Sequence, residues 1–251
     1  MRGPGSFCTS VLKTSDPDRA ARFYSSLLGW TTKPATPHHT FLQFDGKIVA
    51  SMQRIASGHD AWVPYVCVDA LERTIEAATA LGATVVDATQ VPGVAQLATL
   101  RDREAAMLGL WQPDPHGGAE QTDAPGSIWW IEVLARHPPR ARDFYGQLFG
   151  WNARDTSFEP FAVYTVFERA GNQEAGLLPL QPEWEIEPFW NTIVSVDDCR
   201  WRRHFLELSQ SVHLLNLVPS LLGTIELRVG SSAQPPPRAI LSEQSSSRPC
   251  L

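Results

Sequence analysis

The cysteines and histidines are the residues in this sequence whose side chains could act as nucleophiles, general bases or metal ligands. The four cysteines lack C-x-x-C spacing, which predicts reduced thiols, with Cys8 and Cys67 as small core residues. Surface positions in loops, turns and a helix start are expected for His38, His39, His59, His116 and His137. The sequence contains no serine-hydrolase elbow, phosphate-binding loop, H-E-x-x-H motif or dinucleotide fingerprint. It therefore assigns no catalytic residue.

Tryptophans form a second group with chemical meaning, because indole rings stack on flat or cationic organic molecules. The chain has nine of them. Trp62 and Trp190 stand at matched strand starts, and Trp129 and Trp130 lie in another strand-like run. Glu132 should point the same way as Trp130, because side chains alternate along a strand. An equally weighted alternative is that several of these indoles fill an interface between domains.

Charge and hydropathy limit the kinds of partner. The 251 residues include 21 basic and 27 acidic side chains, a formal charge of -6, without long runs of either sign. This pattern does not match a nucleic-acid-binding or anionic-membrane-binding surface. The first residues do not resemble a signal peptide, and no run approaches the ~18 apolar residues of a membrane helix. We expect a soluble cytoplasmic protein, monomer or homodimer, whose partner is a small molecule.

An internal repeat sets the domain organisation. Residues 20–30 read AARFYSSLLGW, and residues 141–151 read ARDFYGQLFGW. The Phe-Tyr and Gly-Trp pairs recur 121 positions apart, which indicates a duplicated domain. The predicted boundaries are a first domain at 1–113, a linker rich in proline and glycine at 114–126, a second domain at 127–241 and a disordered tail at 242–251.

Each half is predicted to contain two copies of a strand–helix–strands unit. In the first unit, a strand over 7–13 precedes a helix with Ser15 as N-cap, which ends at Leu28 before Gly29. Asp45-Gly46 predicts a hairpin turn, and a unit of the same plan follows over 62–111. Trp30 and Trp151, next to the two helix ends, are expected to be structural.

The last unit departs from this plan. Beyond Cys199 the match to the first half weakens, and the glycine that should end the helix is missing. Residues 235–237 are three consecutive prolines, which cannot donate ladder hydrogen bonds in a central strand. We therefore predict that the fourth unit is eroded or incomplete.

Four segments carry a family resemblance: SDPDRAARFYSSLLGW at 15–30, VDALERTIEAATALGATV at 68–85, LRDREAAMLGLWQP at 100–113 and HGGAEQTDAPGSIWWIEVL at 116–134. The chain resembles the vicinal oxygen chelate superfamily of glyoxalases, bleomycin-resistance proteins and extradiol dioxygenases, in particular its two-domain hydroxylase-like members. The resemblance implies an α+β fold in which paired βαβββ units form two glyoxalase-like open barrels in tandem. It also implies a concave sheet that holds the ligand, and a divalent metal in the catalytic members.

The positions where the resemblance would place metal ligands hold other residue types. They are Thr9, Val63 and Gly109 in the first domain and Trp130 and Asn191 in the second. Divalent cations prefer carboxylate and imidazole ligands, so no metal cofactor is predicted. Glu132 and Glu174 are the nearby carboxylates that could hold a metal weakly.

The resulting functional prediction is a glyoxalase-like protein that binds a small organic molecule in a concave cleft without a catalytic metal. The predicted ligand-binding residues are Trp62 in the first cleft, and Trp130, Glu132, Trp190 and Asn191 in the second. Two alternatives remain open. One is a metal-dependent lyase or dioxygenase with displaced ligands, and the other is a non-catalytic pseudo-enzyme or interaction protein.

Overall fold

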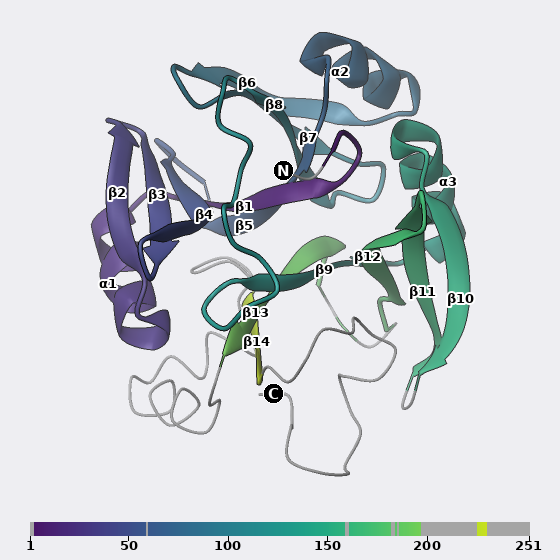
Figure 1. Ribbon diagram of the computed structural model, residues 1–251. Coiled ribbons are helices and arrows are strands. Elements are labelled where there is room, and N and C mark those ends of the chain that lie inside the picture. The colour runs from purple at the N-terminus through teal and green to yellow at the C-terminus, as the bar shows by residue number, and fades with distance from the viewer. Residues whose placement is uncertain are drawn as a thin grey trace.

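A computed structural model describes residues 3–58, 60–158, 161–181, 184, 186–196 and 225–229, and for residues 157–158, 161–162 and 225–229 it describes the backbone alone. The chain forms two curled β-sheets with three helices among the described residues (Figure 1). Two sheets in tandem, built from βαβββ units, confirm the predicted α+β architecture. The predicted tail lies outside the described residues.

The first sheet has eight strands from two units. The first unit comprises β1 (Phe7–Thr14), α1 (Pro17–Leu28), β2 (Thr31–Thr36), β3 (His39–Phe44) and β4 (Lys47–Arg54). The second comprises β5 (Ala61–Cys67), α2 (Leu71–Ala80), β6 (Thr84–Val91), β7 (Ala95–Arg101) and β8 (Met107–Pro113). The strand order is β2-β3-β4-β1-β5-β8-β7-β6, so the two units meet where β1 and β5 run antiparallel.

The second sheet follows the same plan. Its elements are β9 (Ile128–Ala135), α3 (Pro138–Phe149), β10 (Asn152–Phe158), β11 (Phe161–Arg169), β12 (Asn172–Pro179), β13 (Phe189–Val196) and β14 (Ile225–Val229). The order β10-β11-β12-β9-β13-β14 repeats the arrangement of the first sheet, with β9 and β13 antiparallel at the centre. β13 and β14 are the described parts of the fourth unit, and the predicted erosion otherwise concerns residues outside the described ones.

The first helix begins one residue later than its sequence pattern predicts. Asp16, not Ser15, is the N-cap, and its side chain accepts a hydrogen bond of 3.0 Å from the Arg19 N–H. Pro17 then occupies the first turn, where its missing N–H costs nothing. The helix ends at Gly29 with φ of 73°, a left-handed conformation that glycine adopts without strain.

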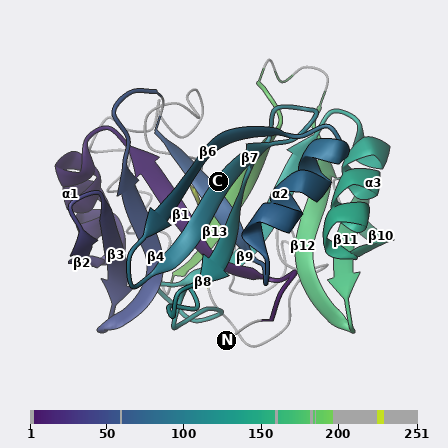
Figure 2. The same cartoon turned by 90° about the horizontal axis from the view of Figure 1, so that it is seen from above.

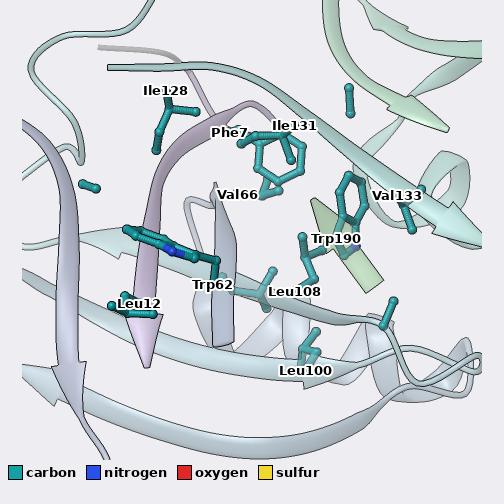
Figure 3. Packing of buried hydrophobic residues seen from close by; sticks show 14 of the residues in the cluster. Phe7, Leu12, Trp62, Val66, Leu100, Leu108, Ile128, Ile131, Val133 and Trp190 are labelled. Atoms are coloured by element: carbon teal, nitrogen blue, oxygen red, sulfur yellow. The ribbon is translucent and has the colours of Figure 1, made fainter. Parts of the chain in front are cut away.

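The main apolar core lies between the two sheets. Figure 3 shows Phe7, Leu12, Trp62 and Val66 of the first domain facing Ile131, Val133 and Trp190 of the second. Residues of all three helices join this core, and α2 and α3 lie side by side (Figure 2). We call the sheet faces turned toward this core the outer faces, and the opposite, concave ones the inner faces. Cys8 and Cys67 are both buried, as predicted.

The repeated Gly-Trp pairs tie the domains together. The Trp30 indole N–H donates to the Gly126 carbonyl over 2.7 Å, and the Trp151 indole N–H donates to the Gly5 carbonyl over 2.7 Å. Each tryptophan thus donates to the residue two positions before the first strand of the other domain. Both indoles are buried, which confirms the structural role predicted for them. None of the helices in the described segments is long and apolar enough to span a membrane.

Candidate functional site

Alternation along β9 divides its side chains between the two faces of the second sheet. Ile131 and Val133 enter the core between the domains, whereas Trp130 and Leu134 belong to a separate cluster on the inner face. Their partners there are Tyr164, Val166, Leu178, Leu180 and Ile193. The sequence-based expectation that Glu132 shares a face with Trp130 agrees with this alternation. The inner face of the second sheet is therefore mostly apolar, with one row of polar contacts at its centre.

Those polar contacts form a chain of hydrogen bonds. The Trp130 indole N–H donates to the Tyr164 hydroxyl over 2.7 Å, and that hydroxyl donates to Glu132 Oε2 over 3.0 Å. Only 2% of Glu132 is exposed. Because a buried carboxylate is costly unless it accepts hydrogen bonds, Tyr164 stabilises Glu132 at the centre of the inner face.

Gly176 makes room for this chain. A Cβ atom at this position would collide with the Tyr164 hydroxyl and lie 2.9 Å from the Trp130 indole nitrogen. Gly176 also pairs with Glu132 across β12 and β9. The absence of a side chain at residue 176 thus allows the phenol to reach the carboxylate.

Asn191 lies next to Glu132 on β13, the strand that flanks β9 on the side opposite to β12. It pairs with Glu132 across β13 and β9, and it is 6% exposed. Three predicted ligand-binding residues, Trp130, Glu132 and Asn191, are therefore neighbours in the centre of the second sheet.

The other two predicted ligand-binding residues lie elsewhere. Trp62 and Trp190 are buried in the core between the domains, and their indole N–H groups donate to the tyrosine hydroxyls of the repeated Phe-Tyr pairs. The Trp62 bond to Tyr24 measures 2.7 Å, and the Trp190 bond to Tyr145 measures 2.9 Å. This is the location that the interface alternative predicts for some of the tryptophans.

Side chains of the first sheet and the linker cover the inner face of that sheet. Tyr65 lies over Gly109, where a Cβ atom would collide with the phenol ring, and its hydroxyl lies 3.0 Å from Thr99 Oγ1. The buried Lys13 ammonium forms an ion pair of 2.5 Å with Asp87. The linker crosses this face as well, because the Ala119 N–H donates to the Cys8 carbonyl over 2.7 Å and the Glu120 N–H to the Ile48 carbonyl over 2.7 Å.

His39 corrects the expectation of a surface histidine in a loop. It lies in β3, is 1% exposed, and packs against Phe41 and Trp111. Neither ring nitrogen has a hydrogen-bond partner within the described part of the chain. Burial, together with a smaller effect of the nearby His116, lowers the pKa of His39 to about 4. His39 is therefore neutral at physiological pH.

A cleft opens where the two domains and the linker meet. It is lined by Phe7, Cys8 and Thr9 of β1, Ala119 and Thr122 of the linker, residues 128–131 of β9, and Glu174 of β12. Its volume is about 380 Å³ including the space open to solvent. Because Trp130 lines the cleft and also donates to Tyr164, the cleft adjoins the Trp130–Tyr164–Glu132 chain.

The described residues do not fit a divalent metal site at the positions that the family resemblance implies. Thr9, Val63 and Gly109 offer no strong ligand, and the place above Gly109 is filled by the Tyr65 ring. In the second sheet Trp130 cannot ligate, and Asn191 supplies an amide beside one carboxylate, Glu132. Among the described residues, no group of three or more histidine, cysteine, aspartate or glutamate side chains is placed to hold a metal ion.

Sequence reasoning missed Tyr164, Gly176 and the position of Glu174 in the cleft. Alternation along residues 161–169 places Tyr164 and Val166 on one face, but it does not show which strand is the neighbour. That neighbour relation comes from the sheet order, in which β12 separates β11 from β9.

Two curled sheets in tandem, built from βαβββ units, resemble the fold of the glyoxalases and extradiol dioxygenases of the vicinal oxygen chelate superfamily. Residues 9–108 match the family model of the glyoxalase-like domain. The match covers most of the first domain, and the second domain repeats its fold.

Relatives and solved structures are similar to this chain over most of its length. The anthracycline biosynthesis protein DnrV of Streptomyces peucetius is 29% identical over 237 residues, covering 83% of this chain and 84% of the relative. CFP32 of Mycobacterium tuberculosis, whose name suggests a glyoxylase, is 26% identical over 198 residues, covering 74% of this chain and 76% of the relative.

Among solved structures, the Mn(II)-bound glyoxalase of Novosphingobium aromaticivorans has a TM-score of 0.57 at 15% identity, covering 82% of this chain and 71% of that one. An extradiol ring-cleaving dioxygenase of Brevibacterium fuscum has a TM-score of 0.59 at 12% identity, covering 93% and 74%. At these identities the two structures establish the shared fold.

Proposed function

We propose that this protein binds a small organic molecule at the inner face of its second sheet, through Trp130, Glu132 and Asn191, without a tightly held metal. The observation that carries this proposal is the hydrogen-bond chain from Trp130 through Tyr164 to Glu132. Buried polar groups on an otherwise apolar face provide orientation and specificity in ligand sites. The first sheet is the less suitable site, because the linker crosses its inner face.

Trp62 and Trp190 remain in the predicted ligand set, but their positions favour the structural alternative. Each indole is buried between the domains and already donates its N–H to a tyrosine. We infer that they support the strands β5 and β13 from the outer faces. On this view Trp62 and Trp190 do not contact the ligand, and they influence its binding by holding the strands of the sheet in position.

The relative DnrV suggests which molecules to screen first. Its name assigns it to anthracycline biosynthesis, and anthracyclines contain flat fused rings of the kind that indoles stack on. The first screen therefore uses a panel of flat polycyclic compounds in the cytoplasmic pH range. We expect the protein to be a monomer or a homodimer under these conditions.

A metal-dependent lyase or dioxygenase is the second candidate function. Supporting it, solved structures with this fold include a Mn(II)-bound glyoxalase and a ring-cleaving dioxygenase, and Glu132 is a carboxylate at the centre of the second sheet. Elemental analysis of purified protein separates the two candidates. One equivalent of Mn, Fe, Ni or Zn per chain, lost in Glu132→Ala, would establish this second candidate in place of our proposal.

The binding proposal is tested by replacing one hydroxyl in each domain. Tyr164→Phe removes the group that links Trp130 to Glu132, so we expect at least a tenfold loss of affinity for hits from the panel. Tyr65→Phe is the matched control in the first sheet, where the hydroxyl contacts Thr99, and should leave affinity within twofold. Affinities are measured by titration calorimetry.

Thermal unfolding shows whether each variant is folded. Equal losses of affinity in both tyrosine variants, or no loss in Tyr164→Phe, would contradict a site at the second sheet. A ligand that binds the folded protein also raises its unfolding temperature, and more so at higher ligand concentration, so a screen of the panel by thermal shift precedes the titrations.

A further inference from the structure

Two cysteine side chains meet on the inner face of the first sheet. Cys8 is the extra residue of a β-bulge in β1, because the pairing with β5 shifts its register between Phe7 and Thr9. Cys67 is the last residue of β5, and both cysteines belong to the apolar cluster of that face. Bulges redirect side chains, and a hydrogen bond from the Cys8 side chain reaches Cys67. Two reduced thiols on neighbouring strands are therefore in contact.

The hydrogen bond between these side chains makes Cys67 the more reactive thiol. It is the largest effect on Cys67 and lowers the pKa of that thiol, although burial acts in the opposite direction. The thiolate form is the one that attacks oxidants. We therefore expect Cys67 to react first, with the Cys8 sulfur beside it to complete a disulfide.

Access to the pair is restricted to small molecules. Cys8 lines the cleft at the domain junction, but it is only 5% exposed, and Cys67 is 6% exposed. The linker lies tightly against Cys8. A Cβ atom on Gly118 would be 2.4 Å from the Cys8 carbonyl oxygen, and the Ala119 N–H donates to that oxygen over 2.7 Å. Hydrogen peroxide, which is little larger than water, fits this restriction, whereas a bulky disulfide such as oxidised glutathione does not.

We propose that Cys8 and Cys67 are a reversible oxidation site, at which hydrogen peroxide joins β1 to β5 by a disulfide. The Cys67 thiolate attacks one peroxide oxygen and the O–O bond breaks. The released hydroxide takes up the proton that Cys67 lost and becomes water, and Cys67 becomes a sulfenic acid. The Cys8 sulfur then attacks the Cys67 sulfur, the S–O bond breaks, and the hydroxyl group leaves as water with the Cys8 proton. Two thiols are oxidised and one peroxide is reduced to two waters.

The disulfide would link the two units of the first domain at the strands where they meet. The loop that it closes contains α1 and the strands β2, β3 and β4. A cross-link over such a loop stabilises a protein mainly by restricting its unfolded chain. Transient disulfides of this kind are the ones found in reducing compartments, where they respond to oxidants. This oxidation site lies in the first sheet and is independent of the proposed ligand site.

Peptide mapping of the native protein tests the proposal. The protein is treated with hydrogen peroxide at pH 7.5, denatured, alkylated, digested without reduction and analysed by mass spectrometry. We expect Cys8 linked to Cys67 in more than half of the chains, and no link after dithiothreitol. Oxidised glutathione at the same concentration should form the link at least tenfold more slowly. The unfolding temperature should rise by at least about 5 °C on oxidation and return on reduction.

Single substitutions test the order of the two steps. Cys8→Ser keeps a hydroxyl donor but removes the second sulfur, so peroxide should leave Cys67 as a sulfenic acid that dimedone traps. Cys67→Ser should give at least tenfold less dimedone adduct, on Cys8. The matched control replaces the other two cysteines of the chain, as Cys199→Ser with Cys250→Ser, and should form the disulfide as the native protein does.

Other results overturn the inference. In the native protein these are Cys8 and Cys67 both alkylated after peroxide treatment, a link from either one to Cys199 or Cys250, or an unfolding temperature that the disulfide leaves unchanged. Equal rates with peroxide and oxidised glutathione, or a dimedone adduct that forms on Cys8 as readily as on Cys67, would also contradict it.

Discussion

Two tyrosines occupy equivalent roles on the inner faces of the two sheets. Tyr65 covers Gly109 in the first sheet, and Tyr164 covers Gly176 in the second. The difference is in what each hydroxyl reaches. Tyr65 meets the neutral Thr99, whereas Tyr164 meets the buried carboxylate of Glu132. A hydrogen bond to a charged group is roughly twice as strong as a neutral one, so the Tyr164 hydroxyl makes the stronger of these two contacts.

His39 supports a prediction at the scale of a single residue. Its folded-state pKa of about 4 is lower than the ordinary 6.5 because the ring is buried. The unfolded chain therefore binds more protons below pH 6.5, and stability is present above that pH and lost as the pH falls toward 4. Between pH 7.5 and 5 this linkage amounts to about 2 kcal/mol of unfolding free energy.

Urea unfolding of the native protein and His39→Phe at several pH values measures this contribution. The advantage of the native protein over the variant should shrink by that amount as the pH falls. Parallel pH profiles for the two proteins would show that His39 is protonated in the folded state as easily as in the unfolded one.

Among the elements, the segments that precede β1 and β9 hold the domains together. Each receives a hydrogen bond from the tryptophan that follows the helix of the other domain. The backbone repeats this symmetry, because the Gly5 N–H donates to the Cys67 carbonyl and the Gly126 N–H donates to the Ser195 carbonyl, each over 2.8 Å. The repeated Gly-Trp motif thus acts between domains.

Trp30→Phe and Trp151→Phe test this symmetry. Each substitution leaves a buried carbonyl without its donor and a small cavity, so we expect each to lower the free energy of unfolding by about 2–4 kcal/mol. Trp184→Phe is the control, because Trp184 is 40% exposed and should change stability by less than about 0.5 kcal/mol. A large loss in one tryptophan variant alone would show that the two contacts are not equivalent.

At the scale of the whole molecule, one apolar core serves both domains. Phe7 of β1 packs against Trp151 and Trp190 of the second domain, with ring centroids 5.5 and 5.3 Å apart. Polar contacts cross the same boundary. The Tyr145 hydroxyl donates to Asp102 over 2.7 Å, and His137 Nδ1 lies 2.6 Å from Glu104 Oε1. A shared core of this kind couples the stability of the two sheets.

The coupling predicts that the protein unfolds in a single calorimetric transition. Phe7→Ala should lower the free energy of unfolding by about 3–5 kcal/mol, and the transition of the native protein should have equal calorimetric and van't Hoff enthalpies. Val85→Ala, at a residue 44% exposed, should leave the transition unchanged. Two separate transitions, only one of which moves in Phe7→Ala, would indicate domains that unfold independently.

The sequence by itself determined the duplication, the βαβββ units and the shared direction of Trp130 and Glu132, because repeats and strand alternation are local in the chain. The hairpin at Asp45-Gly46 and the helix end at Gly29 were predictable for the same reason. Tertiary structure alone decided that His39 is buried, that Trp62 and Trp190 pack between domains, and that Tyr164 reaches Glu132. These facts depend on which strands become neighbours and which sheet face meets the other domain, and such long-range contacts leave no periodic signal in one sequence.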